Sequence, residues 1–143
     1  MSLSRRDLSM LLTTLAAASV PAEAADDKKM LETKTFDYPD LPVKANGQNH
    51  SRAVFDWQTH TGYPIELHMT ELGPGQVPHA PHHHSHEEVM MLRKGVLDAT
   101  YGGKTVHLTA GSVIYMASNV EHQWKNTGTE PAEYFVIALG KGL

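Results

Sequence analysis

The segment Gly75-Gln-Val-Pro-His-Ala-Pro-His-His-His-Ser-His-Glu-Glu88 holds the residues from which the fold and chemistry of this chain are predicted. It places imidazoles at His82 and His84 and a carboxylate at Glu88. Side chains alternate between the two faces of a strand, so His82 and His84 share one side and His83 faces the other. A carboxylate beyond the following turn can reach the same side from the neighbouring strand. The spacing therefore predicts a cluster of metal ligands.

A second segment, from Gly111 to Asn126, supplies another imidazole at His122. Three neutral imidazoles and one carboxylate suit a divalent transition metal of borderline softness. The alternative is a solvated histidine-rich loop that chelates metal loosely. The apolar run Val89-Met-Met-Leu92 follows the histidines directly and predicts a buried strand, which favours a defined site over a loose loop.

The histidine-rich segment resembles the first motif of the cupin superfamily, Gly-x5-His-x-His-x3-4-Glu-x6-Gly. His82, His84, Glu88 and Gly95 stand at the intervals of that motif. Its leading glycine is displaced by one position, because six residues separate Gly75 from His82. The resemblance implies that His82, His84 and Glu88 are metal ligands.

The downstream segment resembles the second cupin motif, Gly-x5-Pro-x-Gly-x2-His-x3-Asn. Gly111, His122 and Asn126 match it, whereas Ala117 replaces the proline and Asn119 replaces the second glycine. Asparagine tolerates the left-handed backbone conformation better than most residues, so a tight turn at Asn119 is still expected. The resemblance spans roughly residues 60–140 and implies that His122 is the fourth metal ligand.

The amino-terminal residues resemble an export signal. Arg5 and Arg6 precede a modest apolar run from Met10 to Val20, and Ala22-Glu-Ala24 offers a site with small residues for signal cleavage. The adjacent arginines, with Leu8 shortly after them, resemble the twin-arginine signal. We therefore expect residues 1–24 to be removed and the protein to reach the periplasm or cell envelope. The apolar run is too short for a stable membrane anchor.

Composition restricts the classes of partner. The chain has 143 residues, a formal charge of −4 and no cysteine. Metal ligation must therefore come from nitrogen and oxygen, and without a basic stripe a nucleic-acid partner is not expected. The mature length fits one domain. We expect residues 25–50 to form a polar leader and extended arm, and residues 51–143 to form the cupin domain. In many cupins such an arm pairs with a second subunit, which implies a homodimer.

Short strand-like runs alternate with turn residues along the domain. The expected strands cover residues 52–57, 65–72, 89–93, 96–101, 104–108, 112–116, 122–126 and 133–139. Even spacing and glycine-bearing turns predict an all-β fold, and the cupin resemblance specifies a single jelly-roll β-barrel. Tyr101-Gly-Gly-Lys104 predicts a two-residue hairpin, and Lys94-Gly95 predicts another.

The same alternation indicates which other residues line the barrel. Met90 and Leu92 share the face of Glu88, and Trp124 shares that of His122. They are interpreted either as the floor of a ligand pocket or as plain core. His86, with His79 and His83, is expected beside the cluster or at its rim. Among the histidines outside both motifs, namely His50, His60, His68 and His107, we expect His68 to be the best candidate for the barrel interior.

A divalent ion with four protein ligands keeps open positions for water, dioxygen or an oxygen-bearing substrate. The sequence thus favours a metal-dependent enzyme acting on a small oxygenated molecule, and the cupin resemblance implies that Glu88 also serves as its catalytic base. The alternative is a non-catalytic envelope protein that binds a metal, a sugar or a small acidic metabolite. Folding before export would load manganese, iron or nickel, although zinc, cobalt and copper suit the same ligands.

Overall fold

The computed structural model describes residues 28–143, so the predicted signal peptide lies outside the described residues. The described part forms nine strands and one short 3-10 helix, η1 (Tyr38–Asp40). The strands are β1 (Val43–Asn46), β2 (Asn49–Gln58), β3 (Pro64–Leu72), β4 (Glu87–Lys94), β5 (Val96–Tyr101), β6 (Lys104–Thr109), β7 (Val113–Met116), β8 (His122–Lys125) and β9 (Ala132–Leu139). Within residues 28–143 no helix is long and apolar enough to cross a membrane.

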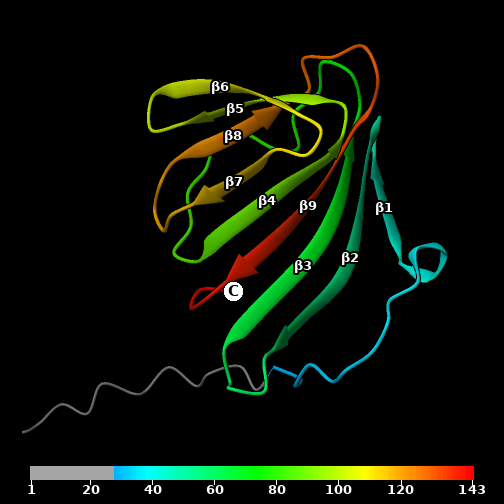
Figure 1. The fold of residues 1–143 in the computed structure, drawn as a ribbon, viewed down its shortest axis with the longest axis vertical. Helices are drawn as coiled ribbons and strands as arrows, with labels where there is room; N and C mark the ends of the chain where they lie inside the picture. Colours follow the sequence, from blue (N-terminus) through cyan, green and yellow to red (C-terminus); the bar gives the residue numbers. More distant parts are fainter. Residues whose placement is uncertain (1–27) are drawn as a thin grey trace, which may run out of the picture.

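The strands form two antiparallel sheets. The larger has six strands in the order β1-β2-β3-β9-β4-β7, and the smaller has three in the order β6-β5-β8 (Figure 1). The chain passes repeatedly from one sheet to the other, so sequential strands such as β8 and β9 lie in different sheets. This arrangement confirms the predicted all-β jelly roll.

The core lies between the sheets and follows the two-residue period of the strands. In β9 every second residue is buried, which places Ala132, Tyr134, Val136 and Ala138 on the inner face. Met90 of β4 packs into the same cluster, as does Trp124 of β8. Burying side chains of this size stabilises a fold by about 1.5–3 kcal/mol each.

The arm preceding the domain contains a strand that the sequence did not predict. β1 pairs with β2 of the same chain, in a register that places Val43 opposite Arg52. β1 is short, lies at the edge of the sheet and has only exposed residues. Because no face of β1 is buried, its sequence lacks the alternation of apolar and polar residues by which a strand is predicted.

One predicted hairpin is confirmed and the other is wrong. Gly102 and Gly103 both have positive φ angles, of 52° and 76°, and connect the paired strands β5 and β6. At Lys94-Gly95 the chain instead leaves the large sheet, because β4 pairs with β9 and β7 whereas β5 pairs with β6 and β8. Gly95 has a φ of 81°, and a Cβ there would lie 2.8 Å from the Cα of Ala132. The glycine is needed for a tight crossover between the sheets.

Asn126 fastens the loops at one end of the barrel. Its side chain is fully buried, and its amide group donates hydrogen bonds to the carbonyl oxygens of Leu72 (2.8 Å) and Glu130 (2.9 Å). Its side-chain oxygen accepts a hydrogen bond from the backbone N–H of Gly128 at 2.9 Å. One side chain thereby satisfies three backbone groups in two separate connections, and the carbonyl of Leu72 among them is buried.

Replacing Asn126 by alanine should lower the free energy of unfolding by about 2–4 kcal/mol, because it removes three hydrogen bonds of about 0.5–1.5 kcal/mol each and leaves the buried carbonyl of Leu72 without a partner. Urea unfolding monitored by tryptophan fluorescence would measure the change. Asn46→Ala is the matched control, since Asn46 is exposed and should stay within about 0.5 kcal/mol of wild type. Equal stability of the two variants would contradict the role assigned to Asn126.

Candidate metal centre and ligand cavity

Two backbone hydrogen bonds join the two histidine-bearing segments. The N–H of His82 donates to the carbonyl of His122 at 3.2 Å, and the N–H of His122 donates to the carbonyl of His82 at 2.9 Å. The carbonyl of His84 accepts a third bond, from the N–H of Asn119 at 2.8 Å. Asn119 adopts a φ of 61°, which confirms the tight turn predicted there. The loop before β4 is therefore fixed against the start of β8.

This pairing gathers the side chains that the sequence singled out. His82, His84 and His122 each offer a nitrogen atom within 4.8 Å of the others. Glu88, on β4, faces them from the large sheet. One of its oxygens lies 3.2 Å from Nε2 of His84, and the other lies 3.4 Å from Nε2 of His122. Residues from a loop and from both sheets thus meet at one point.

The hydrogen bonds of the imidazoles leave ring nitrogens free at this point. Nδ1 of His84 donates to the carbonyl of His86 at 2.8 Å, and Nδ1 of His122 donates to the carbonyl of Val120 at 2.9 Å. Because a carbonyl only accepts, both rings carry their proton on Nδ1 and expose a lone pair on Nε2. These Nε2 atoms, and Nδ1 of His82, are buried and have no hydrogen-bond partner. Unpartnered buried nitrogens beside a carboxylate fit a divalent metal ion.

The electrostatics of the cluster favour a neutral His82 and an ionised Glu88, which are the protonation states that metal binding requires of these two residues. Burial, together with the neighbouring His79, His122 and His84, lowers the pKa of His82 to about 4, so this imidazole is neutral at pH 7. Burial acts to raise the pKa of Glu88, but hydrogen bonding to His122 and the charge of His84 outweigh it and lower the value to about 2. For His122, burial opposes protonation, but the nearby carboxylate of Glu88 and the carbonyl of Val120 favour it and raise its pKa, so protonation of Nε2 competes with metal binding at this residue. A cation at the centre would take over the stabilisation of Glu88 that His122 otherwise supplies.

The remaining histidines of the segment lie where the alternation placed them. His83 is exposed, as predicted for a side chain on the opposite face. His79 is exposed at the rim, with its ring 4.1 Å from that of His82. His86 is stacked on His84 at 3.6 Å, and its Nε2 lies 3.5 Å from an oxygen of Glu88. His84, His86 and Glu88 also offer ligand atoms within 4.8 Å of one another, so His86 borders the cluster as a further potential ligand.

A cavity of about 400 Å³ adjoins the cluster on the inner face of the large sheet. Glu88 contributes to its wall, and Trp124, Tyr134 and Val136 give it an apolar side. Trp124 lines this cavity as predicted, and its ring lies 5.2 Å from that of His122. Met90 and Leu92 are fully buried core residues instead. The predicted pocket thus exists, but only one of its three expected floor residues lines it.

The polar side of the cavity comes mainly from residues that the sequence analysis did not single out. They are Lys44 and Asn46 of β1, Asn49 and Ser51 of β2, and Glu66 and Thr70 of β3. His68 also lines the cavity, as expected for the best-placed histidine outside the motifs, and its Nδ1 lies 2.7 Å from Glu66. The alternation of side chains along β3 places Glu66 and Thr70 on the same face as His68, so these two residues could have been predicted. The exposed residues of β1 show no such alternation.

The fold and this cluster define a class, a small jelly-roll protein with a histidine and carboxylate centre. Residues 68–138 match the family model described as a cupin domain. No curated protein matches the sequence.

Solved structures with this fold are similar to the chain at low sequence identity. An RmlC-like cupin from Shewanella frigidimarina has a TM-score of 0.64 at 15% identity, covering 77% of this chain and 92% of that one. The polyketide cyclase RemF from Streptomyces resistomycificus has a TM-score of 0.64 at 16% identity, covering 76% and 80%. A predicted oxalate decarboxylase from Thermotoga maritima has a TM-score of 0.62 at 17% identity, covering 75% and 99%. Together with the family match, these likenesses place the domain in the cupin superfamily.

Removal of single imidazoles should separate the cluster from its surroundings. His82→Ala, His84→Ala and His122→Ala should each weaken divalent metal binding by more than about 100-fold, because loss of a ligand exceeds the 10–100-fold typical of outer hydrogen-bond partners. His83→Ala is the matched control and should bind like wild type, since its side chain is exposed on the other face. Competition with a chromophoric chelator would measure the affinities. Equal losses at His83 and His84 would indicate a loosely chelating loop.

Proposed function

We propose that this protein is a metal-dependent enzyme that acts on a small oxygen-bearing molecule. The observation that carries the proposal is the set of three buried, unpartnered imidazole nitrogens beside Glu88, at the wall of a cavity of about 400 Å³. Small-ligand sites are commonly concave and mostly apolar with a few converging polar groups. The cluster and the cavity supply both parts.

His82, His84, Glu88 and His122 would hold the divalent ion. When bound, such an ion polarises an oxygen of the substrate and lowers the pKa of coordinated water. The protein residues would fix the ion through the hydrogen bonds that orient His84 and His122. Trp124 and Val136 would exclude water from one side of the substrate. We favour manganese, iron or nickel as the native metal, since export after folding would load the ion in the cytoplasm.

The lining of the cavity supports an oxygen-rich substrate. Asn46 and Ser51 supply hydrogen-bonding groups for hydroxyl or carbonyl oxygens, and Lys44 adds a cation suited to a negatively charged substituent. Lys44 lies on β1 and Glu88 on β4, so four strand spacings separate them in the sheet. A ligand that contacts both would span much of the cavity. The hydrogen-bonding groups and the cation together favour a polyhydroxylated carboxylate as the substrate class.

Glu88 can serve as a metal ligand and as a general base, and its pKa indicates which of these two roles is the stronger. A general base works best with a pKa near the operating pH, whereas a pKa of about 2 makes Glu88 a weak base at neutral pH. The low value favours its role as a metal ligand. Its catalytic role as a proton acceptor would begin when its bond to the metal or to His122 is released.

The first experiment combines metal analysis with turnover. Protein from its native source should carry one of the favoured metals at near-stoichiometric level, and a screen of small oxygenated substrates should reveal turnover. Glu88→Gln should reduce that turnover by at least about 100-fold, the lower end of the contribution of a general base. Glu87→Gln is the matched control, because the neighbouring carboxylate points to the opposite face of β4.

The outcomes distinguish the enzyme from a binding protein. Saturable ligand binding by the metal-loaded protein without any turnover would indicate the non-catalytic alternative. Protein from the native source that carried only zinc or copper would contradict the proposed loading before export. Equal turnover by Glu88→Gln and Glu87→Gln would remove the catalytic role of Glu88.

We also propose export through the twin-arginine route to the periplasm or cell envelope, on the basis of the sequence of residues 1–24. Replacing Arg5 and Arg6 together by lysine should retain the protein in the cytoplasm, because that route requires the arginine pair. Cell fractionation followed by immunodetection would measure the distribution. Lys28→Arg and Lys29→Arg together form a control that changes two cationic residues outside the signal. Unchanged export of the Arg5/Arg6 variant would favour an ordinary secretory signal.

A further inference from the structure

A histidine and carboxylate pair lies in the cavity at a distance from the metal centre. Nδ1 of His68 is 2.7 Å from an oxygen of Glu66, the preceding residue on the same face of β3. The side chains of the two residues are 28% and 26% exposed, and both line the cavity. The pair therefore faces the same space as Glu88, which also lines it.

The hydrogen bond within the pair determines which nitrogen of the His68 ring carries a proton. A carboxylate only accepts hydrogen bonds, so Nδ1 of the neutral ring is protonated and donates to Glu66. The lone pair of the ring is then on Nε2, which can accept a proton. Enzymes commonly use a carboxylate in this way to orient a histidine that acts as a base. The pair thus presents a base to the cavity.

The strand register places this pair near the metal centre. Glu66 on β3 is opposite Ala138 on β9, and Ala138 is opposite Glu88 on β4. Residues directly opposite each other share a face of the sheet, so the backbones of Glu66 and Glu88 are two strand spacings apart, or about 10 Å. Ala138, between them, contributes only a methyl group. No large side chain of this row therefore separates the pair from the centre.

His68 also lies between the metal centre and the cation of the cavity. In the strand order β1-β2-β3-β9-β4, its strand is the middle one, with Lys44 on β1 and Glu88 on β4. Along the strands, Lys44 shares a row with Thr70, two residues after His68. Glu88 shares the row of Glu66, two residues before His68. A ligand that reaches from the centre to Lys44 therefore passes His68 near its middle.

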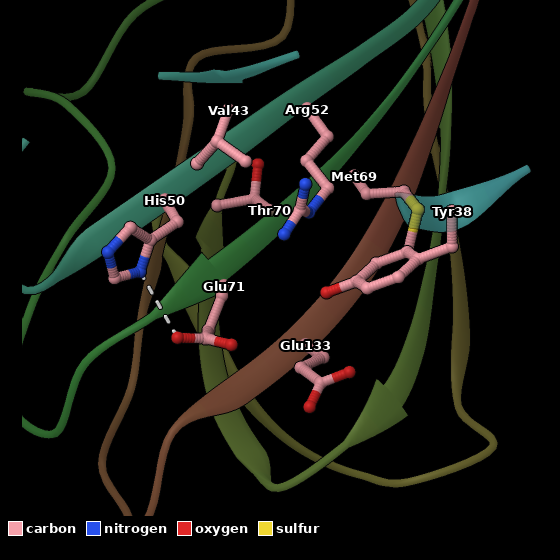
Figure 2. Close-up of a pocket in the computed structure, with 8 residues that line it drawn as sticks. All are labelled: Tyr38, Val43, His50, Arg52, Met69, Thr70, Glu71 and Glu133. Carbon is pink, nitrogen blue, oxygen red and sulfur yellow. Dashed lines mark hydrogen bonds and ion pairs between the residues drawn. The ribbon is translucent and has the colours of Figure 1, made fainter. Parts of the chain in front are cut away.

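Two similar histidine and carboxylate pairs lie elsewhere in the described part of the chain. His107 and Asp98 are 2.7 Å apart on the small sheet and do not line the cavity. Figure 2 shows His50 and Glu71, 3.1 Å apart, in a smaller hollow of about 230 Å³ whose lining includes no proposed metal ligand. His50 also borders the main cavity, but Glu71 does not line it. The pair on β3 is therefore the one placed to act on a ligand at the centre.

We propose that His68, oriented by Glu66, is a base that moves a proton between neighbouring carbon atoms of the substrate. The enzyme is then an isomerase of hydroxyaldehydes or hydroxyketones that carry a carboxylate. The carboxylate of the substrate lies at Lys44, and its carbonyl group lies at the metal centre. This inference rests on the proposed function, because a bound divalent ion supplies the polarisation of the carbonyl oxygen.

The proposed reaction is balanced without a further reactant. The carbon–hydrogen bond next to the carbonyl group breaks and its proton passes to Nε2 of His68. Its electron pair forms a carbon–carbon double bond, and the carbonyl oxygen becomes negatively charged. The imidazolium returns the proton to the former carbonyl carbon, while the hydroxyl proton moves from one substrate oxygen to the other. An aldehyde thereby becomes a ketone, or the reverse, and Glu66 stabilises the transient positive charge of the ring.

This assignment leaves Glu88 free to remain a metal ligand throughout the reaction. Its two oxygens face imidazoles of the centre, at 3.2 Å from Nε2 of His84 and 3.4 Å from Nε2 of His122. A residue that held the ion and also took the proton would have to leave the ion in each turnover. Separate residues for the two tasks avoid this conflict.

Hydrogen exchange into a defined probe tests the inference. D-Glucuronate and D-galacturonate each combine a hydroxyaldehyde, in the open-chain form, with a carboxylate. In deuterium oxide, protein loaded with manganese, iron or nickel should introduce carbon-bound deuterium into at least one of them, as measured by mass spectrometry. His68→Gln should lower the exchange rate by about 100-fold or more, the lower end of the contribution of a general base. His107→Gln is the matched control, because His107 has the same 2.7 Å pairing outside the cavity.

A second measurement does not depend on activity. Nitrogen NMR of the metal-free protein reports which ring nitrogen of His68 carries the proton. That nitrogen should be Nδ1 in wild type, and Glu66→Gln should shift the proton toward Nε2, as expected of a positioning residue. Competition with a chromophoric chelator should give His68→Gln the metal affinity of wild type, which shows that the centre is intact.

The outcomes separate this inference from the proposed function. Exchange that is lost in Glu88→Gln but kept in His68→Gln would overturn the role of His68 and leave the metal-dependent enzyme in place. A proton on Nε2 of wild-type His68, or no exchange into either probe, would overturn the inference even where another substrate is turned over. Exchange by the metal-free protein that His68→Gln abolishes would support the base and contradict the metal dependence.

Discussion

The reciprocal backbone hydrogen bonds between His82 and His122 are the constraint on which the candidate centre depends. They join a loop to β8 across a sequence separation of 40 positions, and they bring imidazoles from two motifs within reach of one ion. Carbonyl groups then fix the Nε2 lone pairs of His84 and His122 toward the centre. The geometry is thus imposed largely by backbone groups, whose positions the sheets determine, and it needs few specialised side chains beyond the imidazoles and Glu88.

The large sheet serves different purposes on its two faces. Its inner face carries the core, the cavity and Glu88, whereas its outer face carries two apolar rows. Because side chains alternate along a strand, β4 presents Glu88 and Met90 inward and Val89 and Met91 outward. The two faces therefore rest on the same strands, but on different side chains. A substitution can test one without removing the other.

The charge of the centre is balanced by its surroundings. Glu88 is ionised beside three imidazoles, and burial favours the neutral form of His82. A divalent ion would replace the positive charge that His122 otherwise provides. A metal-free centre thus leaves polar atoms unpaired in a buried place, and such groups are costly. The cluster is better explained by binding a cation than by stabilising the fold.

Local chemistry determined what the sequence could predict. The spacing of His82, His84, Glu88 and His122 follows from strand alternation and from a family motif, so the cluster and the eight strands of the domain were predictable. The assignment of each strand to one of the two sheets was not predictable, because strand pairing depends on contacts distant in sequence. The prediction of a hairpin at Lys94-Gly95 was wrong for that reason. Lys44 of β1 lines the cavity, although no local sequence pattern indicated it. The sequence by itself determined the cluster of histidines with Glu88 and the all-β class, because both follow from local spacing. Only the tertiary structure decided the cavity lining and the side chains on each face of the large sheet, because both depend on contacts distant in sequence.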